Sequence, residues 1–441
     1  MGRRLMGLTD NLILNVNVLN VGIHTGSWQL SSEPPTAFAD PGYYVRMAKI
    51  AERGLLDALF LADGPALREH PALRPSQALE PSVILASVAA ETEHLGLIGT
   101  LSSTFNDPVE LAHRLLGLDQ LSQGRCAWNV VTTYSVPAGG NFGLADYPDR
   151  PTRYRRAAEF VDVVRALWQD AADAGARGID HQGEFFTVVG SLPQGQSPQG
   201  YPLLVQAGGS PQGRELAGRA ADAVFSAELD LAAGVEHYRH VKDVAVATGR
   251  RRSDVKILPG LITTIGSTEA EAQRRYERQS ALLPAGHDIE RLSQVLGEDL
   301  SGFPLDAPVP GHLLGAVRDP AKFGASLGFR ESVVRSIESR GLTLREAVRA
   351  FSGAGHRVVV GTPVDVADTI EQWFLAGAAD GFNLMPDVFP DGLQIFVDEV
   401  VPILQGRGLF RTAYNESTLR ERFTGYPRPT AAPASARARL A

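Results

Sequence analysis

Short apolar runs rich in β-branched residues alternate along the first half of the chain with longer segments of helical periodicity. The runs predict buried strands: LILNVNVLN (12–20), DALFLAD (57–63), LGLIGTLSS (95–103) and GRCAWNVVTTYS (124–135). The segments between and after them predict helices at 41–54, 81–94, 107–124 and 153–170. Asp107 and Pro108 form a good N-cap and first-turn pair for one of these helices, and Gly124 is a good stop signal.

The alternation continues through the second half of the chain. Strands are predicted at 202–208, 222–228, 255–266 and the end of 358–386, with helices at 211–220, 230–248, before the last strand and near 393–406. Eight strands, each followed by a helix, predict an α/β protein of the (β/α)8 TIM-barrel type, because parallel strands need crossover helices. A doubly wound open sheet is the alternative architecture.

Two regions are longer than a plain barrel requires, and they follow the fourth and seventh strands. The first holds loops at 133–152 and 171–201, with a short hairpin expected at GEFFTVVG. The second is an insertion at about 267–357, which we expect to close a pocket, because long insertions in compact enzymes usually cover a site or an interface. The main domain is expected to span 1–426, with a disordered Pro/Ala-rich tail at 427–441.

Composition narrows the class of protein. The 441 residues are 44% hydrophobic and 21% charged, which is normal for a globular enzyme. A formal net charge of −8 gives no reason to expect nucleic acid. Cys126 is the only cysteine, so an internal disulfide and a cysteine metal cluster are excluded. The sequence shows no signal-peptide pattern and no apolar run of membrane-spanning length, so we expect a cytoplasmic protein. We also expect no metal site.

Polar side chains gather where the predicted strands end, which is where the active site of a (β/α)8 barrel lies. These residues are His24, Trp28, Asp63, Ser102, Ser103, Thr104, Asn106, Asn129, Thr132, Thr133, Gly208, Gly209 and Ser210. They include few charges, which suits a large and mostly neutral heterocycle. Two of them also have a plain structural interpretation, since Asp63 can cap a turn and Asn129 can be a satisfied core amide.

The stretch QAGGSPQGRE (206–215) predicts an anion site. A strand ends there in Gly-Gly-Ser, and Pro211 begins a helix whose N-terminal N–H groups would face the mouth together with Ser210. A phosphate is the most plausible anion. The alternative is that these glycines serve only the turn.

Several motifs together resemble the bacterial luciferase-like flavin monooxygenases. More narrowly, they are similar to the group of nitrilotriacetate, EDTA and dibenzothiophene-sulfone monooxygenases. The motifs are GLLDALFLAD, STFNDPVELAHRLLGLDQLSQGRCAWNVVTT, RYRRAAEF, QAGGSPQGRELAGRAADAVF, VVVGTPVDVADTIEQWFLAGAADGFNLMP and VVPILQGRGLFRTAYNESTLRERF. They cover the chain from about residue 12 to 423 in the family's order.

The resemblance implies a two-component enzyme that binds reduced FMN (FMNH₂) supplied by a separate NAD(P)H-dependent flavin reductase. O₂ is the co-substrate, and one of its atoms would enter a small organic substrate through a C4a-(hydro)peroxyflavin. The cofactor carries the difficult chemistry, and the protein orients it and excludes water. A homodimer or homotetramer is also implied.

Individual residues take roles from the same resemblance. Near the isoalloxazine ring or ribityl chain it places Asp63, Ser103, Asn129 and Thr132. At the phosphate it places Tyr154, Gly209 and Ser210. His24 stands at the substrate side, either as an acid–base group or only as a positioning residue.

One position departs from the family pattern. The family commonly has a histidine four residues before Tyr154, where this chain has Arg150. Arginine can hold a phosphate through bidentate hydrogen bonds, although the change could also mean a shifted loop.

Two alternative functions stay open at this point. One is a luciferase-like oxidoreductase that uses deazaflavin F420 as a hydride carrier on the same barrel. The other is a catalytically silent flavin-binding or scaffold relative. WNVVTT and GLFRTAYNESTLR resemble the monooxygenase group more than the deazaflavin enzymes.

Overall fold

The fold is given by a computed structural model. It describes residues 12–426 except 25, 68–78, 134, 145, 174, 176, 283–285, 318–326 and 352–355. The tail predicted at 427–441 therefore lies outside the described residues. None of the helices within these ranges is long and apolar enough to cross a membrane.

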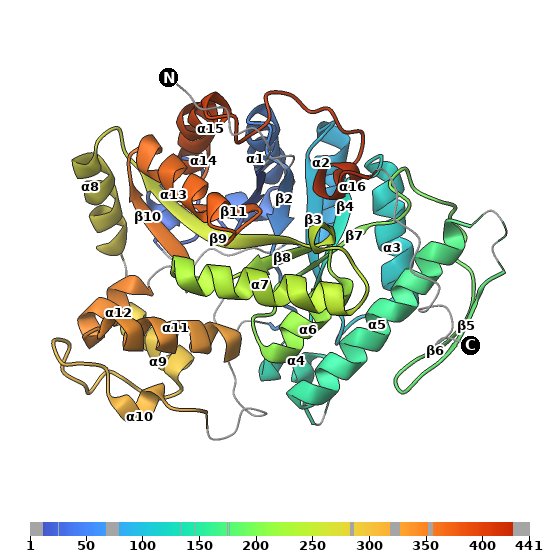
Figure 1. The fold of residues 1–441 in the computed structure, drawn as a ribbon, viewed down its shortest axis with the longest axis horizontal. Coiled ribbons are helices and arrows are strands. Elements are labelled where there is room, and N and C mark those ends of the chain that lie inside the picture. The colour runs from blue at the N-terminus through green and yellow to red at the C-terminus, as the bar shows by residue number, and fades with distance from the viewer. Residues whose placement is uncertain are drawn as a thin grey trace.

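Eight parallel strands close into a barrel, so the open-sheet alternative is wrong (Figure 1). Closure comes from three pairings of the last strands: β11 pairs with β1, and β9 pairs with both β8 and β11. The barrel strands are β1 (Ile13–Asn17), β2 (Ala58–Leu61), β3 (Gly96–Ser102), β4 (Cys126–Val131), β7 (Leu203–Gln206), β8 (Ala223–Ser226), β9 (Lys256–Ile265) and β11 (Gly381–Pro386). All eight lie within the runs predicted from the sequence.

Helices surround the strands and cross from each strand to the next. They are α1 (Pro41–Arg53), α2 (Pro81–Glu91), α3 (Pro108–Leu121), α5 (Arg150–Ala171), α6 (Pro211–Ala220), α7 (Leu231–Ala247) and α13 (Pro363–Leu375), followed after β11 by α14 (Asp391–Ile395), a π-helical turn (Phe396–Val400) and α15 (Val401–Gly406). Asp107 caps α3 as predicted, accepting from Val109 N and Glu110 N. The helix ends at Leu121, so Gly124 lies beyond it in the left-handed turn that leads into β4.

The two long regions carry structure of their own. Between β4 and β7 lie α4 (Val136–Asn141) and a hairpin of β5 (Ile179–Gln182) and β6 (Thr187–Gly190). Between β9 and β10 (Arg357–Gly361) lie α8 (Glu269–Ser280), α9 (His287–Leu296), α10 (Gly311–Leu314), α11 (Leu327–Arg340) and α12 (Leu344–Ala350). Helices α9 to α12 share a separate hydrophobic cluster and lie together on one side of the barrel in Figure 1.

The strand β4 shows how the alternation of side chains builds the barrel. Cys126, Trp128 and Val130 face the surrounding helices, and Trp128 packs edge-on against Trp168 of α5 with ring centroids 6.4 Å apart. Ala127 belongs to the interior cluster instead, so Asn129, two residues further on, also points inward. The carboxamide in the middle of this apolar strand therefore faces the barrel interior.

Three buried aspartates hold the N-terminal end of the barrel together. Asp57, Asp222 and Asp380 each lie one residue before a strand, and each carboxylate accepts the backbone N–H of the second residue of a neighbouring strand. The carboxylate oxygen lies 2.7 Å from Leu14 N in Asp57, 2.8 Å from Leu204 N in Asp222 and 2.7 Å from Ile257 N in Asp380. A cation neutralises each one: Arg411 at 2.8 Å, Arg420 at 3.6 Å and Lys242 at 2.9 Å, respectively.

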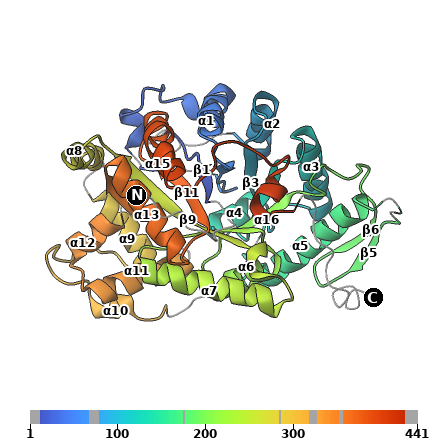
Figure 2. The ribbon, with the colours of Figure 1, turned by 45° about the horizontal axis from the view of Figure 1, so that its top comes forward.

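The helix α16 (Leu419–Thr424) closes the same end of the barrel. Its Leu419 and Phe423 belong to the hydrophobic cluster that fills the lower interior, and a Cβ on Gly96 at the start of β3 would clash with Leu419. Figure 2 shows α16 inside the ring of outer helices. Among the described residues, α16 therefore blocks the N-terminal end, and the end where the strands finish is left for a ligand.

The Arg411→Leu substitution should destabilise the fold strongly. Arg411 and Asp57 are 4% and 0% exposed, so the substitution would leave an unpaired carboxylate in the interior. We expect the free energy of unfolding to fall by roughly 3–5 kcal/mol, the usual cost of breaking a buried pair on one side. Denaturant titration measures it.

Arg345 provides the matched control, because it forms an equally short pair with Asp306 at the surface. The Arg345→Leu variant should unfold at nearly the wild-type denaturant concentration, since exposed pairs contribute little. Equal losses in the two variants would show that the Asp57 pair does not hold the barrel together.

Candidate active site at the mouth of the barrel

The upper half of the barrel interior is lined by amides. Asn15, Asn17, Asn129 and Asn383 are 1–3% exposed and lie on inward-facing positions of β1, β4 and β11. Asn15 and Asn383 are register partners across β1 and β11, and Asn129 is the register partner of Thr100 in β3. The lower interior is apolar by contrast, with Ile13, Ala58, Ala127, Leu203 and Ala223 among its residues. We call the amide-lined upper part the chamber.

Several polar atoms of the chamber have no hydrogen-bond partner among the described residues. They are Oδ1 of Asn15, both amide atoms of Asn17, Oδ1 of Asn129 and Oδ1 of Asn383. The second arm of Asn129 donates to Thr100 Oγ1 at 2.9 Å, and that of Asn383 to Leu258 O at 3.4 Å. Buried polar groups almost always have a partner, so the chamber fits a ligand or waters with several hydrogen-bonding groups.

A histidine from outside the barrel strands completes this interior. His356, one residue before β10, stacks on the inward-facing Phe225 of β8 with centroids 5.0 Å apart and planes at 5°. Phe225 in turn meets Phe60 of β2 at 5.4 Å. Gly260 makes the room, because a Cβ there would come within 2.3 Å of His356 Nδ1.

Burial controls the charge of His356. It lowers the pKa of the imidazole to about 4, opposed by a hydrogen bond to the backbone of Ser226 and assisted by Arg291. The ring is therefore neutral at physiological pH.

A second set of residues meets where β7 ends and α6 begins. Ser210 caps α6, accepting from Gly213 N at 3.2 Å, and its hydroxyl lies 3.2 Å from the Tyr154 hydroxyl of α5. A Cβ on Gly208 would come within 3.0 Å of that tyrosine oxygen, so only glycine lets the strand end pass so close. Gly209 lies between them, half-buried, with its carbonyl accepting from Arg214. The structure thus brings together three of the residues predicted for a phosphate.

Arg150 lies at the start of α5, one turn before Tyr154. The sequence predicted this helix from 153, but Asp149 caps it and it begins at Arg150. The side chain is 7% exposed, and no ion pair to it is present in the part of the chain that the structure describes. Burial lowers the pKa of Arg150, while Tyr154 and Glu331 of α11 act in the opposite direction. A buried guanidinium without a salt bridge is suited to receive an anion.

The turns after β3 and β4 are tied to each other. Ser103 is 1% exposed, and its hydroxyl donates to Val131 O at 3.1 Å, while Thr104 Oγ1 donates to the carbonyl of Thr132 at 2.9 Å. The alternation places Ser102 rather than Ser103 on the inner face, where Ser102 Oγ accepts from Thr133 Oγ1 at 2.7 Å. Thr132 is half-buried at the rim.

The two remaining predicted residues lie on the loops after β1 and β2. His24 is half-buried, and its Nδ1 accepts from Gly26 N at 3.1 Å. This loop packs on α8 of the insertion, where Gln279 donates to Ser27 Oγ at 3.1 Å. Asp63 is exposed, two residues beyond the end of β2. Neither residue belongs to the buried chamber itself.

Sequence reasoning missed the largest group of chamber residues. Asn15, Asn17 and Asn383 were visible as polar positions within apolar strands, and that alternation could have identified them. His356 and Gly260 gave no local signal, because their meeting depends on how β8, β9 and β10 lie side by side.

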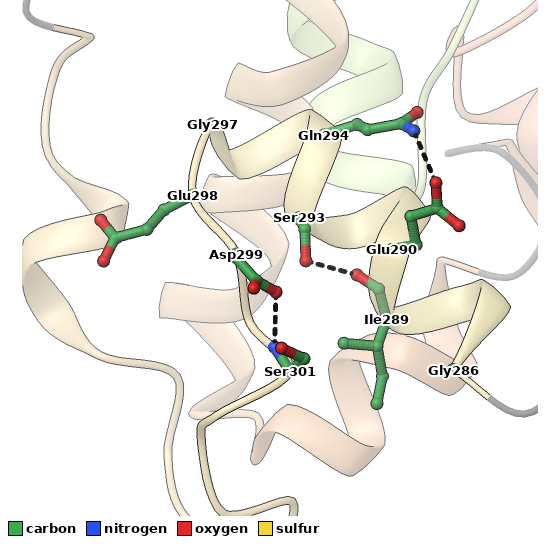
Figure 3. Close-up of a pocket in the computed structure, with 9 residues that line it drawn as sticks. All are labelled: Gly286, Ile289, Glu290, Ser293, Gln294, Gly297, Glu298, Asp299 and Ser301. Atoms are coloured by element: carbon green, nitrogen blue, oxygen red, sulfur yellow. Dashed lines mark hydrogen bonds between the residues drawn. The ribbon is translucent and has the colours of Figure 1, made fainter.

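A separate surface pocket of about 820 Å³ lies in the insertion, formed by α9 and the turn after it (Figure 3). Its polar side chains are mainly acidic or neutral, including Glu290, Glu298 and Asp299. It includes none of the predicted site residues, and its acidic lining does not suit a phosphate.

Comparison with known proteins places the chain in one class of enzyme. Residues 19–380 match the family model described as luciferase-like monooxygenase. The chain is 39% identical to nitrilotriacetate monooxygenase component A of Aminobacter aminovorans, over 96% of this chain and 98% of the relative. It is 35% identical to the solved EDTA monooxygenase from Chelativorans sp. BNC1, with a TM-score of 0.80 and coverage of 95% and 99%. A riboflavin lyase, solved with modified FMN and riboflavin, superposes with a TM-score of 0.82 at 28% identity, covering 96% and 98%.

These matches define a monooxygenase with a (β/α)8 barrel. The chain belongs to the luciferase-like monooxygenase family, whose members are flavin-dependent enzymes. The resemblance inferred from the sequence motifs is confirmed.

The half-buried His356, whose Nδ1 is shielded from solvent, should make the fold sensitive to acid. Because its folded pKa of about 4 lies below the unfolded value near 6.5, its contribution is intact above about pH 6.5 and is lost as the pH falls toward about 4. When the pH falls from about 7 to about 4.5, the free energy of unfolding of the wild type should decrease by on the order of 2 kcal/mol more than that of the His356→Phe variant. Urea titrations of both proteins at the two pH values measure the difference. Parallel losses would contradict a neutral buried imidazole.

Proposed function

We propose that the chain is the oxygenase component of a two-component system that uses reduced FMN and O₂. One oxygen atom enters an organic substrate, the other leaves as water, and the two electrons come from the reduced flavin, which becomes oxidised. The family match and the full-length similarity to nitrilotriacetate monooxygenase component A support this proposal. The flavin, when bound, would supply the electrons and the activation of O₂.

The observation that carries the proposal is the anion corner formed by Arg150, Tyr154 and Ser210. A buried guanidinium without a salt bridge to any described residue lies one helical turn before a tyrosine hydroxyl, which is 3.2 Å from the serine that caps α6. Charge, hydroxyl donors and a helix N-terminus are the three features that favour a phosphate. Arg150 would thus replace the histidine of the family without loss of phosphate binding.

The chamber supports the placement of the flavin ring. An isoalloxazine has a large apolar surface and one edge of alternating donors and acceptors, and the chamber pairs aromatic rings with amides that have unpartnered arms. Asn129 and Thr132 would lie near the ring or ribityl chain, with Ser103 contributing through the turn it fixes. Asp63 is exposed on the loop after β2, and it would contact the flavin through a movement of this loop toward the mouth.

His24 would act at the substrate side of the flavin. It lies on the loop between the barrel mouth and α8 of the insertion, and an imidazole can exchange protons near neutral pH. Residues 267–357 would close the site and exclude water. The exclusion of water prevents side reactions of the activated oxygen.

The reduced flavin would come from a separate NAD(P)H-dependent flavin reductase. The word "component" in the relative's name fits a system of more than one protein. Assembly of this chain into two or four copies stays a prediction.

Substitutions at the anion corner should weaken FMN binding through its phosphate. The affinity for FMNH₂ should fall roughly ten- to a hundredfold in Arg150→Met and roughly threefold in Tyr154→Phe. The arginine matters more because charge-assisted hydrogen bonds are the stronger ones. Anaerobic titration followed by flavin fluorescence or absorbance measures both.

Riboflavin and Arg155 provide the controls for this prediction. Riboflavin lacks the phosphate, so its affinity should be nearly the same in all variants. Arg155 is exposed on the same helix and pairs with Glu184, so Arg155→Met should bind FMNH₂ as the wild type does. Equal losses for FMN and riboflavin would place the phosphate elsewhere.

The proposed activity is tested by binding FMN and FMNH₂ anaerobically to the purified protein and then mixing the reduced complex rapidly with O₂. We expect a preference for FMNH₂ and a transient absorbance in the peroxyflavin region. Nitrilotriacetate, EDTA and dibenzothiophene sulfone form the first substrate panel, and a true substrate should accelerate decay of the transient and yield an oxygenated product.

Absence of binding in both redox states would contradict the proposal. Binding of reduced F420 instead would favour the deazaflavin oxidoreductase. Flavin binding without any reaction with O₂ would favour the silent relative.

A further inference from the structure

His356 occupies a place that the barrel strands leave open for it. Along one side of β9, β8 pairs with Lys256 to Pro259 and β10 pairs with Leu261 to Ile265, so the two strands follow each other in line. His356 lies at the junction between them, next to the register position of Gly260. Since Leu258 faces the barrel interior, Gly260 also does, and the imidazole fills the space of its missing side chain.

The orientation of the ring determines its hydrogen-bonding character. The backbone of Ser226 raises the pKa of the imidazole, but burial lowers it more, so the ring is neutral. The nitrogen without a partner among the described residues is the buried Nδ1. In a neutral imidazole one nitrogen carries a hydrogen and the other a lone pair, so Nδ1 is able to act as a buried acceptor.

The surroundings of Nδ1 indicate what it meets. The ring lies flat on Phe225, which extends through Phe60 across the interior, and together these rings form an aromatic wall beside the amides of the chamber. A buried acceptor left without a donor costs free energy that a ligand N–H would recover.

We propose that His356 is a ligand-contacting residue whose Nδ1 accepts a hydrogen bond from an N–H group of the flavin ring. This inference rests on the proposed function. His356 joins the insertion to β10, so the proposed contact makes the end of the insertion part of the cofactor site.

The test compares anaerobic affinities for FMN and FMNH₂ in the wild type, His356→Phe, His356→Asn and Gly260→Ala. Phenylalanine keeps the stack on Phe225 and removes the acceptor, so we expect affinity to fall roughly three- to tenfold. Asparagine retains an acceptor and should recover part of the loss. Gly260→Ala keeps the histidine but displaces its imidazole ring, so it should weaken binding to a similar extent.

His94 is the matched control for the change from histidine to phenylalanine. It is exposed and stacks on Tyr414 with centroids 4.8 Å apart, beside the loop that precedes β3 and away from the chamber. The His94→Phe variant should bind both flavins like the wild type.

The redox state shows which N–H is involved. A loss confined to FMNH₂ would identify an N–H that exists only in the reduced ring, and an equal loss for both forms would identify the N–H that they share. Both results support the proposal. Unchanged affinity for both flavins in folded His356→Phe and Gly260→Ala would overturn it, whereas a wild type that binds no flavin would overturn the proposed function itself.

Discussion

Closure of the barrel at one end decides where everything else in this molecule can happen. Asp57, Asp222 and Asp380 each tie the start of a neighbouring strand and carry a buried cation, and α16 fills the space they surround. Among the described residues, this leaves the carboxyl ends of the strands as the open side of the interior. In the proposed function, substrate, cofactor and O₂ would share this mouth, and the insertion, whose α8 contacts the loop after β1, would control access.

The interior changes character along its axis. Below, apolar side chains pack against one another, and above, four asparagines and a neutral imidazole bring polar atoms without a partner among the described residues into the interior. A folded chain tolerates such groups only when something else satisfies them, or when function repays their cost. The anion corner at Arg150, Tyr154 and Ser210 lies at the rim of the same interior. One elongated ligand with a charged end and a polar ring would satisfy both sets.

Much of this architecture follows from sequence periodicity, and the site follows only in part. The alternation around Asn129 and the Gly-Gly-Ser turn before Pro211 each identified their places, because those signals are local. The start of α5 was placed three residues late, although Asp149 and Pro151 mark it, so Arg150 was not recognised as helical. His356 could not be found, because its position depends on a glycine almost a hundred residues away and on three strands meeting in register.

A crystal structure of the protein with FMN would show directly whether the flavin binds at the barrel mouth. We expect a phosphate within hydrogen-bonding distance of Arg150, Tyr154 and Ser210, and an isoalloxazine ring in the chamber between the asparagines and His356. A flavin bound outside the barrel mouth, or a phosphate that touches none of those three side chains, would contradict it.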